Sequence, residues 1–294
     1  MARPSQESWT VLAGMRTLFP VGWTLGTRGV QDVMRTRYPI TRLAGVMLGV
    51  LLATAVTAVL PPQVARVAAA SPAAAQPGTT SLPTPEDAVR QYIAGVAAGD
   101  VGMILDATAV DEMSAGFDFA AQVERVRAMM LTFGLAPTQY PFFADMDHTI
   151  AAAQILGQTK MLVYSLLSTE TIDGNTIVPA DKQRADAFVA QVDPARLAGL
   201  TVRDIRYSNP TYEHNPKNLE NAARQAAMYG ADELTERLAL VELDGKLYEV
   251  GFTLLRYGEE WGIYSQVANL ANTPILGTAV PTTLEQYDYE TSPS

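Results

Sequence analysis

The hydrophobic pattern contains one long uncharged segment well before the periodic ones begin. Residues 43–60 read LAGVMLGVLLATAVTAVL, which is 18 residues without a charged side chain. As a helix this segment would cover about 27 Å, close to the thickness of the hydrocarbon core of a bilayer. Arginines at 35, 37 and 42 precede it, and two prolines at 61–62 end it. The pattern predicts a transmembrane helix or the apolar core of a signal peptide.

Helical periodicity begins at Thr84. Thr84 is a good N-cap, the proline after it suits the first helical position, and Glu86 and Asp87 complement the helix dipole. Apolar side chains follow at helical spacing: Val89, Tyr92, Ile93 and Val96. Gly99 is predicted to end this helix and Asp100 to cap a second, short one.

The middle of the chain is predicted to be mainly helical. Residues 117–133 carry apolar side chains spaced by four and three, and 143–167 and 181–192 also have helical patterns. For 161–167 (MLVYSLL) a buried strand is an equal alternative, because the run is short and apolar. Residues 170–178 contain Asp-Gly and are predicted as a small hairpin.

The C-terminal third predicts an antiparallel sheet. After a strand at 200–207, residues 212–216 are predicted as a solvated polar turn, and a helix capped by Asn215 follows. A meander of three strands is then predicted at 234–243, 246–258 and 261–270. Asp244-Gly245 marks a two-residue hairpin turn, and apolar residues alternate along the middle strand at Tyr248, Val250, Phe252 and Leu254. Helices followed by antiparallel strands predict an α+β fold. The polar residues 271–294 are predicted to form a tail.

The charges are segregated around the apolar segment. The chain has a net charge of −10, but residues 1–76 carry seven Arg and two acids, whereas 77–294 carry 14 basic and 29 acidic residues. By the positive-inside rule, 1–42 would be a cytoplasmic basic tail and the acidic remainder would lie outside. The bilayer is thus an expected partner, through 43–60. The acidic balance argues against nucleic-acid binding.

The N-terminal region leaves alternatives open. Segment 43–60 is either an uncleaved signal anchor, which gives a single-pass cell-membrane protein, or part of a signal peptide cleaved near Ala75, which gives a secreted one. Met34 is an alternative start, with 1–33 as a start-site artefact. In either case 61–84, rich in Pro, Ala, Ser and Thr, is expected to be a linker.

The amino-acid composition excludes several kinds of functional site. The chain has no cysteine and two histidines, which excludes disulfides, thiolate metal sites, iron–sulfur clusters and a cysteine nucleophile. We find no nucleophile elbow, phosphate-binding loop or dinucleotide fingerprint. No cofactor or metal is therefore expected.

Two segments resemble a known family. Residues 83–106 (PTPEDAVRQYIAGVAAGDVGMILD) combine a Pro-acid start, an aromatic in mid-helix, Gly-Asp and a second short helix. Residues 256–265 (RYGEEWGIYS) combine a strand end, a Gly-acid turn and a strand that starts with Trp. In this order the features resemble the NTF2-like (cystatin-like, SnoaL-like) α+β cone. The resemblance covers about 84–110 and 200–270.

The resemblance implies one exported domain over 85–270, with 111–199 as a helical insertion. It implies no reaction, because the fold hosts both enzymes and non-catalytic domains. An acid or base would be a side chain that lines the cone, and the candidates are Tyr92, Asp106, Asp145, Asp147 and His148. The last three also offer two carboxylates and an imidazole to a cation. Alternatively, Asp145 or Asp147 starts the apolar helix that follows.

Two hypotheses about function remain. The first is a non-catalytic, membrane-tethered module that binds a partner protein or a small apolar ligand. The second is an exported enzyme of the isomerase, dehydratase or hydrolase kind. A cone filled by Phe252, Leu254 and Trp261 would favour the module, whereas an open cone with a buried, unpaired Asp or His would favour the enzyme.

Overall fold

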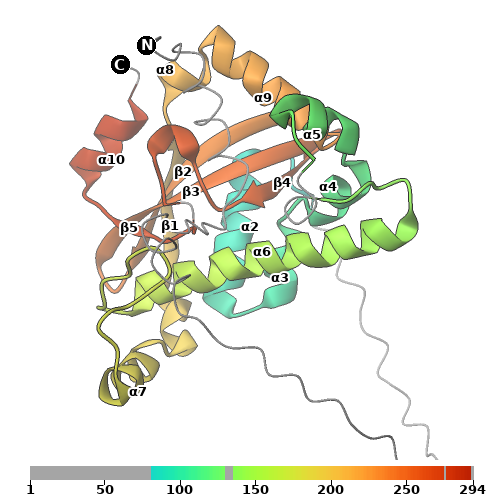
Figure 1. The fold of residues 1–294 in the computed structure, drawn as a ribbon. Coiled ribbons are helices and arrows are strands. Elements are labelled where there is room, and N and C mark those ends of the chain that lie inside the picture. Colours follow the sequence, from blue (N-terminus) through green and yellow to red (C-terminus); the bar gives the residue numbers. More distant parts are fainter. Residues whose placement is uncertain (1–80, 130–134, 275, 293–294) are drawn as a thin grey trace, which may run out of the picture. The chain divides into compact units, whose positions relative to one another are not determined.

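The computed structural model describes residues 81–129, 135–274 and 276–292 (Figure 1). The segments predicted at 1–42, 43–60 and 61–80 lie outside these residues. The helices and 3-10 turns are α2 Pro85–Ala98, α3 Val101–Asp106, α4 Val110–Gly116, α5 Phe119–Val126, α6 Pro141–Leu167, α7 Lys182–Gln191, η1 Pro194–Gly199, α8 Pro210–Glu213, α9 Pro216–Met228, η2 Asn269–Ala271 and α10 Leu284–Thr291. The strands are β1 Thr201–Tyr207, β2 Glu233–Leu243, β3 Lys246–Tyr257, β4 Glu260–Ser265 and β5 Val280–Pro281.

The strands form one antiparallel sheet in the order β1-β2-β3-β4, and the short β5 also pairs with β3. The β2–β3 hairpin turns at Asp244-Gly245, where both residues have positive φ, as the sequence predicts. Residues opposite each other in the register, such as Arg237 and Phe252, project from the same face. The α+β prediction is confirmed: a helical part packs on a C-terminal antiparallel sheet.

The face of β3 that carries Tyr248, Val250, Phe252 and Leu254 is the inner face of the sheet. It packs against the helical part, and the ring of Phe252 meets that of Tyr92 on α2 edge-on at 5.5 Å between centroids. The helix caps predicted at Thr84, Gly99 and Asp100 are all present. Both faces of β2 are buried, which explains the uninterrupted apolar run at 238–241 (LALV).

The segment 266–291 covers the opposite, outer face of the sheet. Tyr287 on α10 is buried and packs against Leu238 and Leu240 of β2. A Cβ atom at Gly251 would lie 2.5 Å from the backbone nitrogen of Ala268, so only glycine fits where the segment crosses β3. The predicted polar tail is therefore wrong for 280–291, which forms β5 and α10.

The predicted helix at 117–133 is wrong in its bounds. Within the described residues of this region, the structure has one short helix, α5, which ends at Val126; its C-cap Arg127 has a left-handed φ of 53°. Two features separate α5 from the preceding helix, α4. Asp118 accepts a hydrogen bond from the Ala121 N–H and so caps a new helix, and Gly116 packs against the backbone at Tyr229. Residues 130–134 lie outside the described residues.

Other boundaries also differ from the sequence prediction. Residues 161–167 continue α6 as a helix, not a strand, and the predicted hairpin at 170–178 is reduced to one bridge between Asp173 and Thr176. The last meander strand stops at Ser265, because the chain then crosses to the outer face. The linker ends earlier than predicted, since Leu82 is buried and its carbonyl accepts the Trp261 N–H.

Helix α6 runs across the domain (Figure 1). By length and composition it is apolar enough to cross a membrane. However, side chains along one of its faces, Ile155, Leu162 and Leu166 among them, are buried against the rest of the domain. This is the pattern of a core helix, so α6 is weak evidence for a span.

Candidate functional site

Tyr92 lies in the interior between α2 and α6. Its hydroxyl donates to Oε1 of Gln266 and shares a 2.6 Å hydrogen bond with Oγ1 of Thr159. Gln266 is held in turn by Gln158, whose Oε1 accepts the Gln266 N–H at 2.9 Å. Burial raises the pKa of Tyr92 far above its usual range. The hydroxyl is thus fully hydrogen-bonded and shielded from solvent, which suits a structural role rather than acid–base chemistry.

Asp147 is buried, but it is not an unpaired carboxylate. Both of its oxygens accept the Ala136 N–H, at 2.8 and 3.0 Å. Burial raises the pKa of Asp147, and the bond from Ala136 acts in the opposite direction. The expectation that Asp145 or Asp147 starts the helix is wrong, because α6 begins at Pro141. The Asp147 side chain instead holds the segment before α6 in place through Ala136.

The remaining candidates lie at the surface. His148 Nε2 is 2.7 Å from Oδ1 of Asp111 on α4, and both side chains are half-exposed or more. Asp106 is exposed at the end of α3, and Asp145 is exposed on α6. The structure therefore distributes the five predicted residues over the interior, a loop anchor and the surface, and does not assemble them. Among the described residues, no group of three His, Asp or Glu side chains is placed to hold a metal ion.

An open cleft of about 1130 Å³ lies at one end of the domain. It is bounded by the last turn of α6, the loop that follows, the β2–β3 turn and the start of α10. Hydroxyl groups dominate its polar lining: Ser165, Ser168, Thr169, Thr171, Tyr248, Thr278, Thr282 and Thr283. Lys246, Glu170 and Glu285 supply the charges, and Leu247 and Leu284 supply apolar surface. Ser165, Ser168, Thr169, Thr282 and Thr283 already form hydrogen bonds within the chain, so further hydrogen bonds to a ligand would come chiefly from Thr171, Tyr248 and Thr278.

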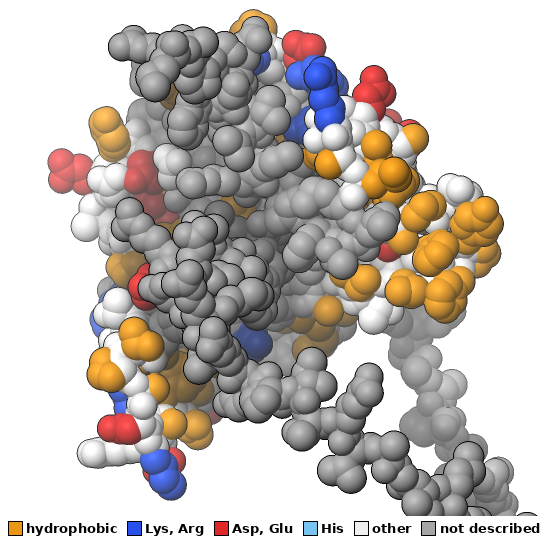
Figure 2. Space-filling model, viewed as in Figure 1, with side chains coloured by type: hydrophobic (Ala, Val, Ile, Leu, Met, Phe, Trp, Pro, Cys, Tyr) orange, Lys and Arg blue, Asp and Glu red, His pale blue; other side chains and the backbone are white. Residues whose placement is uncertain are grey.

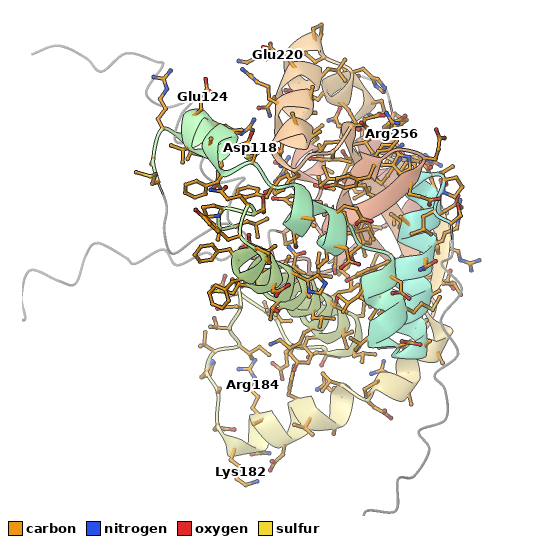
Figure 3. All side chains as sticks on the ribbon, turned by 90° about the vertical axis from the view of Figure 1, so that its right-hand side faces the viewer. Asp118, Glu124, Lys182, Arg184, Glu220 and Arg256 are labelled. Carbon is orange, nitrogen blue, oxygen red and sulfur yellow. The ribbon has the colours of Figure 1, made fainter. Side chains whose placement is uncertain are left out.

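The walls of the cleft are fixed by side-chain contacts. Arg184 projects from α7 (Figure 3) and donates to Oε2 of Glu170, 2.8 Å from Nε. On the opposite wall the Ala279 N–H donates to Oγ of Ser165 at 2.8 Å. Beneath the rim, Thr282 donates to Oε1 of Glu249 at 2.6 Å. These bonds tie α6, α7 and β5 together, so the cleft is largely preformed.

A charged cluster that the sequence analysis missed lies on the inner face near the start of α2. Arg237 is buried, donates to Glu86 at 2.6 Å and stacks on the Tyr207 ring at 3.9 Å from its centroid. Glu213 turns inward and accepts a hydrogen bond from Thr235, so the predicted solvated turn at 212–216 is wrong for this residue. Its Oε2 is buried and has no hydrogen-bond partner in the described part of the chain.

Two carboxyl groups are buried on the outer face. Glu236 accepts hydrogen bonds from the Leu270 N–H and the Ser208 hydroxyl, and burial raises its pKa to about 7. Burial likewise raises the pKa of Glu249 to about 7. Neither residue lines the cleft. The sequence signal was available for one of them: Glu236-Arg237 interrupts an otherwise apolar strand, and charges at such positions are seldom free of partners.

The comparisons with known proteins identify no family for this chain. No protein-family model and no curated protein matches the chain. One solved structure that matches is a cystatin-like protein from Ruminococcus gnavus, with 19% sequence identity and a TM-score of 0.44. The match covers 67% of this chain and 42% of that one. A similarity of this size does not establish membership of a family, so no property of that protein is assigned here.

Proposed function

We propose that residues 81–292 form a non-catalytic binding module, held outside the cytoplasm by 43–60, that takes up a polar segment of a partner protein in the hydroxyl-lined cleft. The open cleft, in which hydroxyl side chains lie among apolar ones, is the observation that carries this proposal. A small ligand fits it less well than an extended one, because small ligands favour enclosed pockets and this cleft is open.

The packed interior supports a binding module over an enzyme. Phe252 and Leu254 are fully buried on the inner face, and Trp261 closes the same core. The two buried candidates that the sequence analysis named, the Tyr92 hydroxyl and the Asp147 carboxylate, already have partners within the domain. The His148–Asp111 pair lies in the open, away from the cleft lining.

The lining of the cleft supports a polypeptide as the occupant. An extended peptide presents one N–H and one C=O per residue, and short hydroxyl side chains can donate to or accept from either group. Lys246 and Glu285 lie on the lining with opposite charges, which allows a partner with mixed charges. The exposed Leu284 adds apolar contact at the rim.

A selection with defined probes tests the proposal. Peptides chosen from a random phage-displayed library on the full chain should bind about tenfold more weakly, or about 1.4 kcal/mol, to a Thr278→Arg variant. That substitution places a long side chain in the cleft. The matched control is Leu219→Arg, since Leu219 is exposed on α9 and lies outside the cleft.

Peptides that bind wild type and Thr278→Arg equally would contradict the assignment of the cleft. Turnover of a panel of ester, enol and hydroxy-acyl substrates that is lost on substitution of Glu170 or Glu285 would favour the enzyme hypothesis instead.

A further inference from the structure

One face of α6 is apolar and exposed along more than half of the helix. Figure 2 shows hydrophobic side chains gathered over the start of α6. Phe142, Met146 and Ile150 are 69%, 43% and 41% exposed, and the same face continues through Ala153 and Gly157. We call these five residues the α6 stripe. Their spacing of four, four, three and four places them on one side of the helix.

The α6 stripe changes in size along the helix. Its first half carries large side chains, whereas its second half carries Ala153 and Gly157. A Cβ atom built at Gly157 meets nothing within 4 Å, so open space lies over this end. The buried side chains of α6, such as Ile155 and Leu162, lie on the opposite side. The stripe is thus the side of α6 that faces away from the core of the domain.

From this geometry we infer that the α6 stripe pairs with the same stripe of a second copy, with the two helices antiparallel about a two-fold axis. An axis that passes near Ala151 and Ala152 sets Met146 of one copy against Gly157 of the other. The same axis sets Ile150 against Ala153. In these two pairs a large side chain fills the space over a small one, and each contact occurs twice, as an isologous interface requires; Phe142 lies at the ends of the pairing, opposite Met161.

Charge complementarity selects the same arrangement. Asp145 and Lys160 are exposed, and neither takes part in an ion pair among the described residues. At 100° per residue both lie on the same side of the stripe. In an antiparallel two-fold pair, the flank of the stripe that carries Asp145 and Lys160 lies beside the same flank of the second copy. Measured along the helix axis, Asp145 of one copy is then offset from Lys160 of the other by about two residues, or about 3 Å. A parallel pair would instead set large side chains against each other, and it would leave Asp145 of one copy and Lys160 of the other on opposite flanks of the interface.

A second copy also fits better than a bilayer surface. A bilayer surface binds an apolar helix face regardless of the order of large and small side chains along it. Binding to a bilayer also would not require an acidic and a basic residue beside the stripe. The inference does not depend on the cleft or on the tether, so it goes beyond the proposed function.

The full chain, purified in detergent micelles, is suited to a cross-linking test because it has no cysteine. An Ala153→Cys variant places one thiol beside the axis in each copy, and we expect it to form a disulfide-linked dimer at micromolar concentration under mild oxidation. Leu219→Cys, exposed on α9, is the matched control and should cross-link at least about tenfold more slowly. Equal rates for the two variants would overturn the inference.

Substitutions then test the contacts. Gly157→Leu has open space within its own copy, so it should keep the wild-type melting temperature yet weaken the dimer at least about tenfold in sedimentation. Lys160→Asp should weaken the dimer, and Asp145→Lys combined with Lys160→Asp should restore it. A dimer unchanged by Gly157→Leu would overturn the proposal. So would a monomer whose Ala153→Cys thiol is shielded only when lipid is present, because that result would assign the stripe to the membrane.

Discussion

Glu236 and Glu249 make the stability of the domain depend on pH. Burial raises the pKa of each folded-state carboxyl to about 7, from 4.5 in the unfolded chain. Each group therefore binds its proton more tightly in the folded state. Its contribution to stability is fully present below about pH 4.5 and is lost as the pH rises through 7.

We expect the melting temperature to fall as the pH rises from about 5 to about 8. Glu236→Gln, which cannot ionise, should flatten this dependence, because the amide stays neutral across the range. Thermal melts followed by circular dichroism at several pH values measure the effect. The control is Glu220→Gln on the exposed face of α9, which should leave the slope of wild type unchanged. A slope that persists in Glu236→Gln and Glu249→Gln together would contradict this account.

Asp147 and His148 are neighbours in the sequence, but we expect them to respond differently to substitution. Asp147→Ala leaves the Ala136 N–H without its acceptor in a part-buried site, which costs about 1–3 kcal/mol. His148→Ala breaks only an exposed contact with Asp111, and should cost less than about 1 kcal/mol. Urea denaturation of the two variants separates them. Equal losses of stability would contradict the difference in their environments.

The candidate site was harder to predict from the sequence than the elements around it. Local spacing identified Asp145, Asp147 and His148 as a cluster, but successive positions on a helix point in different directions. The partner of His148 is Asp111, which is 37 residues away and on another helix. The cleft could not be predicted at all, because its walls come from four segments that are joined only by the fold.

The inner face of the meander holds the structural centre of the domain. Phe252 is fully buried against Tyr92, and Trp261 lies in the same core. Removing a large buried aromatic side chain costs about 3–5 kcal/mol, a large share of a typical stability of about 5–15 kcal/mol. Phe252→Ala and Trp261→Ala should therefore both melt at much lower temperatures. If Trp261→Ala melts like wild type but loses peptide binding, Trp261 belongs to a ligand site instead.

Elements with strong local signals were predicted well. Thr84, Gly99 and Asp100 act as caps where the sequence places them, and the hairpin at Asp244-Gly245 follows from turn chemistry alone. Helix α10 was missed because its sequence is polar apart from a few aromatics. The packing of α10 depends on one buried side chain, Tyr287, which contacts the outer face of β2. The periodicity of the β2 sequence does not show whether that outer face is buried or exposed to solvent.

The orientation of the whole chain about the membrane is a prediction that the absence of cysteine makes simple to test. We expect Leu219→Cys to react with a membrane-impermeant maleimide in intact spheroplasts, because the arginines before 43–60 favour the cytoplasm. A Ser5→Cys variant should react only after lysis. Reaction of Leu219→Cys only after lysis would reverse the orientation, and its release into the medium would indicate cleavage near Ala75.

The cover of the outer face has a consequence for synthesis. Segment 266–291 follows, in the chain, every one of the strands β1 to β4 that it protects. A nascent chain that has reached Ser265 can pair these strands, yet Leu238 and Leu240 remain in water until Tyr287 arrives. Unfinished chains therefore display an apolar strand surface that finished chains hide.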